Sequence, residues 1–381
     1  MPEGPVYLDC AATAPIDPRV LAETIRFMTE EFGNAGSRTH EFGRRARQAV
    51  ERARDQVAAA AGCSRGEVIF TSGATESNNL AILGLAEHGR RTGRRHIVST
   101  AIEHNAVLEP LAFLARNGFE ITLVAPTPGG WVEPAAIAAA LRDQTLLVSV
   151  MHVNNETGVV QPLADIAAAL GDHPAFLHVD AAQGFSLLGD DLRNGRIDLV
   201  SISGHKIHAP KGIGALIARR RGGTRPPLAP LMYGGGQEMG LRPGTLPVHL
   251  VVALGLASQL AASERTMRRQ QCLAFRQRLV AELAPLWPQY NGDQSRCAPH
   301  IVNVSFPGVD AESAMAALRD VAAVSHGAAC SSASGLCSHV LRAMGLEADR
   351  IDGALRISWC HMTPEPDFHR FRTAIGSLTR R

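Results

Sequence analysis

Short apolar runs alternate with stretches of helical period between about residues 17 and 255. Such runs predict buried strands, and their alternation with helices predicts a mostly parallel sheet that helices cover. The expected helices include 18–31, 44–60, 134–142 and 163–170. The expected strands are 68–70, 96–100, 121–125, 146–151, 176–180, 199–203 and 214–218.

The pattern changes near residue 248. A long helical stretch, 248–286, leads to a second strand–helix unit, whose strands we expect at 301–306 and 354–359. We therefore expect a large domain over residues 17–255 and a smaller α/β domain over residues 256–381. The N-terminal segment 1–16 is expected to pack on the smaller domain.

Composition narrows the class of protein. The 381 residues have a formal charge of +2, so nothing global indicates nucleic-acid binding or an anionic membrane. No apolar run approaches the roughly 18 residues of a membrane span, and the N-terminus lacks the pattern of a signal peptide. Seven scattered cysteines are typical of a reducing compartment rather than a disulfide framework. We expect a cytoplasmic enzyme.

Two polar residues end neighbouring apolar runs. Asp180 ends the run 176–180, and Lys206 follows the run 199–203. Open α/β sheets bind ligands at the carboxyl ends of their strands. A lysine and an acid placed there suit pyridoxal 5'-phosphate (PLP), because the lysine forms a Schiff base and the acid pairs with the pyridinium nitrogen. A buried ion pair is the alternative.

A small-residue turn, TSGATES at 71–77, follows one expected strand and opens a helix. Backbone N–H groups and hydroxyls at such a turn can bind a phosphate, although most such turns only cap helices. Ser203 and His205 flank the lysine and could donate to the same phosphate. Gln183 lies three residues after Asp180, within reach of the cofactor's ring hydroxyl. These segments predict one cofactor site.

The ordered motifs along the chain identify a family. The sequence resembles the cysteine desulfurases, PLP enzymes that take sulfur from cysteine, from residue 7 to beyond residue 356. The segments that carry the resemblance are LDCAATAP (8–15), GN (33–34), TSGATES (71–77), EH (103–104), MHVNNETGVVQP (151–162), SGHKIHAPKG (203–212) and GGGQEMGLRPGT (234–245).

The resemblance implies the aspartate-aminotransferase fold (PLP fold type I) and roles for single residues. His104 matches the ring-stacking histidine, and Asn155 matches the asparagine near the ring hydroxyl and the substrate carboxylate. Arg356, helped by Asn34, is the implied clamp for the carboxylate of L-cysteine; a structural ion pair is its other interpretation. The resemblance also implies that Ala74 and Thr75 belong to the phosphate turn. Thr245 would reach the phosphate of the neighbouring subunit, so a homodimer is implied; Pro243 stands where a small serine is expected.

Cys330 lies in the glycine- and serine-rich segment 325–335 and matches the family's persulfide-carrying cysteine. Its thiolate would take the substrate's sulfur after Lys206 removes the α-proton, and alanine would leave. We expect no metal, although His326, Cys330, Cys337 and His339 offer a zinc alternative. Cys337 is either a resolving thiol or an incidental one.

Several interpretations stay open. The sulfur acceptor is expected to be a scaffold or thiolation enzyme serving iron–sulfur clusters, tRNA thiolation or DNA phosphorothioation. A selenocysteine lyase or another PLP-dependent β-lyase could use the same site without Cys330, and a scaffold with a vestigial site is the non-enzyme alternative. The spacing of the other five cysteines indicates no disulfide pairing, and we take them as structural: Cys10, Cys63, Cys272, Cys297 and Cys360. The arginines at 90–95 and 219–225 are expected to be solvated loop charges.

Overall fold

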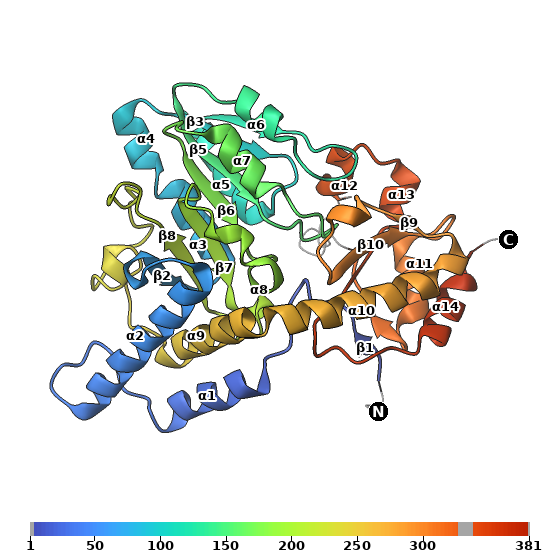
Figure 1. The fold of residues 1–381 in the computed structure, drawn as a ribbon, viewed down its shortest axis with the longest axis horizontal. Coiled ribbons are helices and arrows are strands. Elements are labelled where there is room, and N and C mark those ends of the chain that lie inside the picture. The colour runs from blue at the N-terminus through green and yellow to red at the C-terminus, as the bar shows by residue number, and fades with distance from the viewer. Residues whose placement is uncertain (1–3, 327–337, 380–381) are drawn as a thin grey trace.

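A seven-stranded sheet forms the centre of the larger part of the molecule in the computed structural model, which describes residues 4–326 and 338–379 (Figure 1). The strand order is β2-β8-β7-β6-β5-β3-β4, and β8 alone runs antiparallel to both of its neighbours. The strands are β2 (Val68–Thr71), β3 (His96–Thr100), β4 (Glu120–Val124), β5 (Thr145–Met151), β6 (Phe176–Asp180), β7 (Leu199–Ser203) and β8 (Gly214–Ala218).

Helices cover both faces of this sheet. Successive residues of a strand point to opposite faces, so Leu147 and Leu199 belong to one apolar cluster while Val148 and Val200 belong to the other. One face packs against α1 (Pro18–Thr29), α2 (Glu41–Ala61) and α9 (Val248–Ser263). The other packs against α3 (Ala74–Leu83), α4 (Ala86–Thr92) and α5 (Asn105–Arg116). Three further helices lie on the face of α1, α2 and α9: α6 (Pro134–Ala139), α7 (Leu163–Leu170) and α8 (Phe185–Leu188).

Local sequence accounts for several helix ends. Asp17 caps α1 by accepting a hydrogen bond from the N–H of Arg19, and Pro18 occupies the first helical position, where no hydrogen-bonded N–H is needed. Helix α2 ends at Gly62, whose φ of 67° lies in the left-handed region that glycine adopts without strain.

A smaller antiparallel sheet, β12-β10-β9, lies at the other end of the molecule (Figure 1). Its strands are β9 (Gln289–Tyr290), β10 (Ile301–Ser305) and β12 (Leu355–Ser358). Helix α10 (Arg265–Leu283) runs from the large sheet to this one. The remaining elements are β1 (Val6–Tyr7), which pairs with β11 (Ala322–Ala323), and the helices α11 (Ala311–Leu318), α12 (His339–Ala343), α13 (Ala348–Asp352) and α14 (Phe368–Gly376).

The predicted α/β fold is confirmed, and most strands begin and end within a residue of their expected bounds. The expected long helix over 248–286 is two helices, because the chain leaves the helical conformation at Glu264. None of the helices within the described ranges is long and apolar enough to cross a bilayer.

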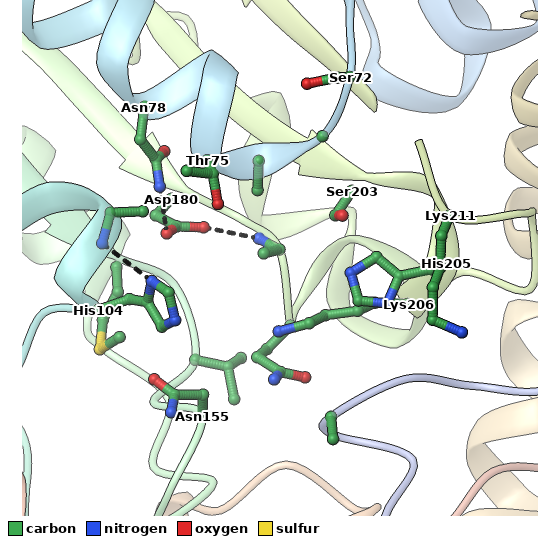
Figure 2. Close-up of a pocket in the computed structure, with 18 of the residues that line it drawn as sticks. Ser72, Thr75, Asn78, His104, Asn155, Asp180, Ser203, His205, Lys206 and Lys211 are labelled. Atoms are coloured by element: carbon green, nitrogen blue, oxygen red, sulfur yellow. Dashed lines mark hydrogen bonds between the residues drawn. The ribbon is translucent and has the colours of Figure 1, made fainter. Parts of the chain in front are cut away.

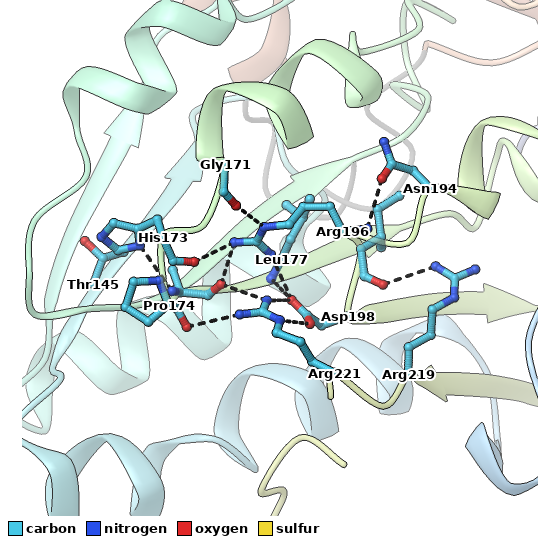
Figure 3. Close-up of polar contacts among 12 residues, drawn as sticks. Thr145, Gly171, His173, Pro174, Leu177, Asn194, Arg196, Asp198, Arg219 and Arg221 are labelled. Carbon is cyan, nitrogen blue, oxygen red and sulfur yellow. Dashed lines mark hydrogen bonds and ion pairs between the residues drawn. The ribbon is translucent and has the colours of Figure 1, made fainter. Parts of the chain in front are cut away.

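The interpretation of the arginines after β8 as solvated charges is wrong for Arg219 (Figure 3). Arg219 is 8% exposed, and its guanidinium donates to the backbone oxygens of Leu192 (2.6 Å) and Ala61 (2.9 Å). Arg221 keeps an exposed side chain, which forms an ion pair with the buried Asp198. A guanidinium can satisfy several carbonyls at once, so these arginines tie loops to the sheet.

Candidate active site

A pocket of about 480 Å³ opens at the carboxyl ends of the three central parallel strands (Figure 2). Strand β5 contributes Met151, β6 contributes Asp180 and β7 contributes Ser203. The turn after β7 adds His205 and Lys206, since parallel strands deliver the residues that follow them to the same edge. Nearly all the predicted cofactor residues line this pocket: Ala74, Thr75, His104, Asn155, Asp180, Gln183, Ser203, His205 and Lys206.

Asp180 is held in one orientation at the pocket wall. Its Oδ2 accepts a hydrogen bond from Nδ2 of Asn78 (2.7 Å), and its Oδ1 accepts one from the N–H of Ala182 (3.0 Å). Asp180 is 6% exposed, and beneath it the fully buried His178 lies between the hydroxyls of Ser149 and Ser201. Burial lowers the pKa of His178 to about 4, so this ring is neutral near pH 7.

His104 is the N-cap of α5, where its Nδ1 accepts a hydrogen bond from the N–H of Ala106 (3.0 Å). Nδ1 therefore carries no proton, and a neutral ring keeps its proton on Nε2. Burial lowers the pKa of His104, and Lys206 lowers it further, whereas Asp180 opposes the shift. The result is a flat, neutral ring on the wall opposite Ser203 and His205 (Figure 2).

The end of the pocket formed by the turn before α3 suits an anionic group. The turn at Ser72, Gly73 and Thr75 opens α3, whose first backbone N–H groups face the pocket end. Ser203 and His205 lie across from it, with both lysines of the pocket nearby. Burial, Lys206 and Lys211 together lower the pKa of His205 to about 4, so it stays a neutral hydrogen-bonding group.

These residues fit PLP. Donors gather at one end for a phosphate, a carboxylate lies at the other for the ring nitrogen, and a lysine stands between them. The Oδ1 of Asn78 is buried and bonds to no described residue, so the pocket also retains an unsatisfied acceptor. Gln183, predicted at the ring hydroxyl, lines the pocket while its amide donates to the Ala11 oxygen (2.9 Å).

Three predicted residues do not line the pocket. Asn34 is exposed and caps its own loop by accepting from the N–H of Gly36 (2.8 Å). Thr245 is exposed on the segment before α9. Arg356 is 3% exposed, and its guanidinium donates to Asp9 Oδ1 (2.8 Å) and to the Asn155 oxygen (2.9 Å). The carboxylate clamp thus stays a prediction, and the ion pair that we also considered is present.

Cys330 and Cys337 lie outside the described residues, so neither the persulfide role nor the zinc alternative is tested. His339, the one described residue of that zinc set beyond the gap, contacts the Glu103 backbone oxygen through Nε2 (2.9 Å). Glu103 itself is fully buried, and burial raises its pKa to about 8. Its Oε1 accepts from the Thr100 hydroxyl and from the N–H of Met151.

Sequence reasoning missed Lys211 and Asn78, both of which line the pocket. Asn78 lies one helical turn after the phosphate turn, which brings it to Asp180. For Lys211 a signal was available, because the chain has 38 basic residues and only two, Lys206 and Lys211, are lysines. Both lysines lie in one pocket, which a random distribution would rarely produce.

Comparisons with known proteins identify the relatives of this chain. The aminotransferase class-V family model matches residues 6–371. Cysteine desulfurase IscS of Escherichia coli (strain K12 / DH10B) is 45% identical over 98% of this chain and 93% of its own length.

Solved structures show the same fold. DndA from Streptomyces lividans is 50% identical with a TM-score of 0.81, over 93% of this chain and 99% of that one. SspA in complex with cysteine is 35% identical with a TM-score of 0.82, over 94% and 100% of the two chains. A NifS-like protein is 33% identical with a TM-score of 0.88, over 98% of both.

The fold, the pocket and the full-length match show that the chain belongs to the class-V aminotransferase family. The cofactor of this family is PLP, which confirms the predicted cofactor. Within the family the chain is a PLP-dependent cysteine desulfurase, as the near-full-length identity to IscS shows. The predicted family and activity are confirmed.

Proposed function

We propose that this protein transfers the sulfur of L-cysteine to the thiol of Cys330 as a persulfide, releases alanine, and passes the sulfur to an acceptor protein. The observation that carries the proposal is the convergence of Lys206, Asp180 and the phosphate turn in one pocket. PLP, when bound, draws electrons away from the α-carbon of the substrate. Every other step belongs to side chains of this chain.

Lys206 would hold the cofactor covalently, and its amine, when free, would accept the α-proton of the substrate. Asp180 holds the ring nitrogen protonated, because Asn78 and Ala182 fix its carboxylate in place. His104 stacks as a neutral ring and keeps a proton on Nε2, which it can donate near the substrate.

Cys330 supplies the nucleophile. Its thiolate attacks the substrate's sulfur, so the substrate's carbon–sulfur bond breaks and a sulfur–sulfur bond forms. The electron pair left on the β-carbon is protonated, which yields alanine; no external oxidant is required. A thiol reductant or the acceptor then removes the outer sulfur and restores the thiol.

The anchors of the segment that carries Cys330 support this role. At one end Ser325 pairs with Arg356 through two backbone hydrogen bonds, and Arg356 contacts Asn155 of the pocket. At the other end His339 contacts the residue before His104. Cys330 is five residues from Ser325, and an extended chain of that length spans up to roughly 17 Å. The described residues on both sides of the segment thus contact the pocket or its neighbours.

The test is alanine release from L-cysteine with a thiol reductant, compared between the wild type and Cys330→Ser. We expect the variant to keep the visible absorbance of the bound cofactor and to lose nearly all alanine release and all persulfide. Cys297→Ser is the control, since Cys297 is part-buried, lines neither cavity, and its thiol donates to the backbone oxygens of Thr157 and Asp293 and accepts from Gln294 Nε2. Equal alanine from both enzymes would instead indicate a selenocysteine lyase or another β-lyase.

We propose a homodimer in which Thr245 of each subunit reaches the other subunit's phosphate. Leu231, Met232 and Tyr233, the last 87% exposed, form an apolar stretch that precedes the segment 234–245. Exposed apolar residues of this kind mark association surfaces. Light scattering should report twice the 40.6 kDa chain mass, and a monomer with full activity would refute the proposal.

We also propose the division into a large domain, 17–255, and a small domain formed by 1–16 and 256–381. Support comes from the apolar core of the small sheet, which contains Leu8 and residues from Cys272 onward, with Leu187 as the exception.

The sulfur acceptor is proposed to be a scaffold or thiolation enzyme. Mass spectrometry of the partners captured by persulfide-loaded protein tests this proposal.

A further inference from the structure

A second cavity, of about 20 Å³, adjoins the cofactor pocket and shares Gln183 and Lys206 with it. We call it the rear cavity. Its lining is unusual because cysteines and histidines from well-separated segments meet there. Besides Lys206 the lining includes Cys10, Cys272, Cys360, His208, His300 and His361. Three of the chain's seven cysteines therefore face one small space.

Three of these residues place possible metal-ligand atoms close together. The ligand atoms of His208, Cys360 and His361 all lie within 4.8 Å of one another. Tetrahedral zinc, with bonds of about 2.0–2.1 Å to nitrogen and about 2.3 Å to sulfur, holds its ligand atoms roughly 3.4–3.7 Å apart. Small side-chain rotations would therefore close the three residues around one ion.

The hydrogen bond of His208 leaves one of its ring nitrogens able to bind a metal ion. Its Nδ1 lies 3.0 Å from the Pro15 carbonyl oxygen, which can only accept, so Nδ1 carries the proton and Nε2 has a free lone pair. Metal-bound histidines are commonly oriented by such a carbonyl. The backbone of His208 has a φ of 72°, a left-handed conformation that is unfavourable for histidine and that tends to persist at functional sites. Its ring lies 4.8 Å from that of His361.

Cys10 is the candidate for the fourth ligand. Cys10 is 6% exposed and lines the same cavity as Cys360. The Thr363 hydroxyl lies 3.8 Å from Cys10 Sγ and 3.5 Å from Cys360 Sγ, so one side chain orients both sulfurs. Two thiolates and two imidazoles form a soft tetrahedral set that prefers zinc to magnesium or calcium.

Two further observations favour an ion in the rear cavity. The rear cavity has room for about one water-sized group, which is also the space that a single ion needs. His300 is 9% exposed, lines the same cavity, and has a buried Nδ1 that bonds to no residue in the described ranges. Buried polar atoms normally have partners, so an orphan at this position favours a polar or ionic occupant.

We propose that Cys10, His208, Cys360 and His361 bind one zinc-class divalent cation behind Lys206. The ion joins the N-terminal segment, the loop that follows Lys206 and the end of β12, which are far apart in sequence. All four positions of the ion are filled by side chains, so the site is structural and activates no water. Its role is to fix the backbone around Lys206.

The test uses the intact holoenzyme in a Cys330→Ser background, so that the reactive thiol cannot contribute a ligand. After zinc loading and gel filtration, elemental analysis should give one zinc per chain. X-ray absorption at the zinc edge should show sulfur at about 2.3 Å and nitrogen at about 2.0–2.1 Å in equal numbers. The double variant Cys360→Ser/His361→Ala should lose the zinc and retain the cofactor absorbance, whereas Cys297→Ser should lose neither.

The first measurement needs no variant, so it holds even if the double variant misfolds. Substoichiometric zinc in the loaded enzyme would overturn the proposal. A Cys10–Cys360 disulfide found by peptide mapping, with no metal, would replace it with a redox pair. Zinc retained by a folded double variant would place the ion elsewhere, with His326, Cys337 and His339 as the next ligands to mutate.

Discussion

Lys206 separates two cavities of different chemistry. The cofactor pocket is large and open, and the strand ends that form it supply a carboxylate, hydroxyls, an amide and two lysines. The rear cavity is small, and helix α10 and several loop segments supply it with thiols and imidazoles. From this difference we infer two roles for the residues around Lys206. Those that line the cofactor pocket take part in the reaction, and those that line the rear cavity stabilise the backbone. The cavity that a residue lines, rather than its distance from Lys206, determines its role.

The largest expected effect distinguishes the two lysines of the cofactor pocket. Lys206→Ala should lose the cofactor's attachment and reduce alanine release by roughly 10³-fold or more, since it removes both the covalent link and the proton acceptor. Lys211→Ala should retain the attachment. Borohydride reduction followed by peptide mapping checks both, and cofactor fixed to Lys211 in the wild type would reverse the assignment.

The next largest effect is expected for Glu103. Burial raises the pKa of its carboxyl from the ordinary range to about 8. Folding thus favours the protonated form, so its contribution to stability is complete below about pH 4.5 and is lost as the pH rises through about 8. The expected loss is on the order of 3–4 kcal/mol. Urea unfolding of wild type and Glu103→Gln at about pH 5 and pH 8 tests this, and parallel pH profiles would contradict it.

The rear cavity should affect stability more than chemistry. For zinc at about 100 times its Kd, Cys360→Ser/His361→Ala should forfeit about 2–3 kcal/mol of unfolding free energy. Alanine release per bound cofactor should fall far less than in Lys206→Ala. Thermal unfolding with and without zinc is the measurement, and a loss of turnover equal to that of Lys206→Ala would abolish the distinction between the cavities.

The smallest effect belongs to a surface ion pair far from both cavities. Arg142 and Glu120 contact each other with side chains that are 46% and 63% exposed. Such pairs are screened by water and salt, so Arg142→Ala should change the unfolding free energy by less than about 0.5 kcal/mol. A larger change in urea unfolding would show that the stability measurements above are not specific to the cavities.

Residues that follow regular strands were predicted best. Asp180 and Ser203 are the last residues of β6 and β7, Lys206 follows three residues after β7, and the period of the apolar runs located those strands. The helix break at Glu264 was missed, because no glycine or proline marks it in the sequence. The buried role of Arg219 was missed, since composition does not tell which carbonyls lie within reach.

The α/β fold, the family and most residues of the cofactor pocket follow from local periodicity or short ordered motifs in the sequence, whereas Asn78 and Lys211 became apparent only in the folded chain. Only the tertiary structure decided what happens to residues that are distant along the chain. It paired Arg356 with Asp9 and brought Cys10 to Cys360, two cysteines for which spacing gave no reason to meet. The physical reason is that strand order and helix packing, which no local pattern encodes, set the distances between segments.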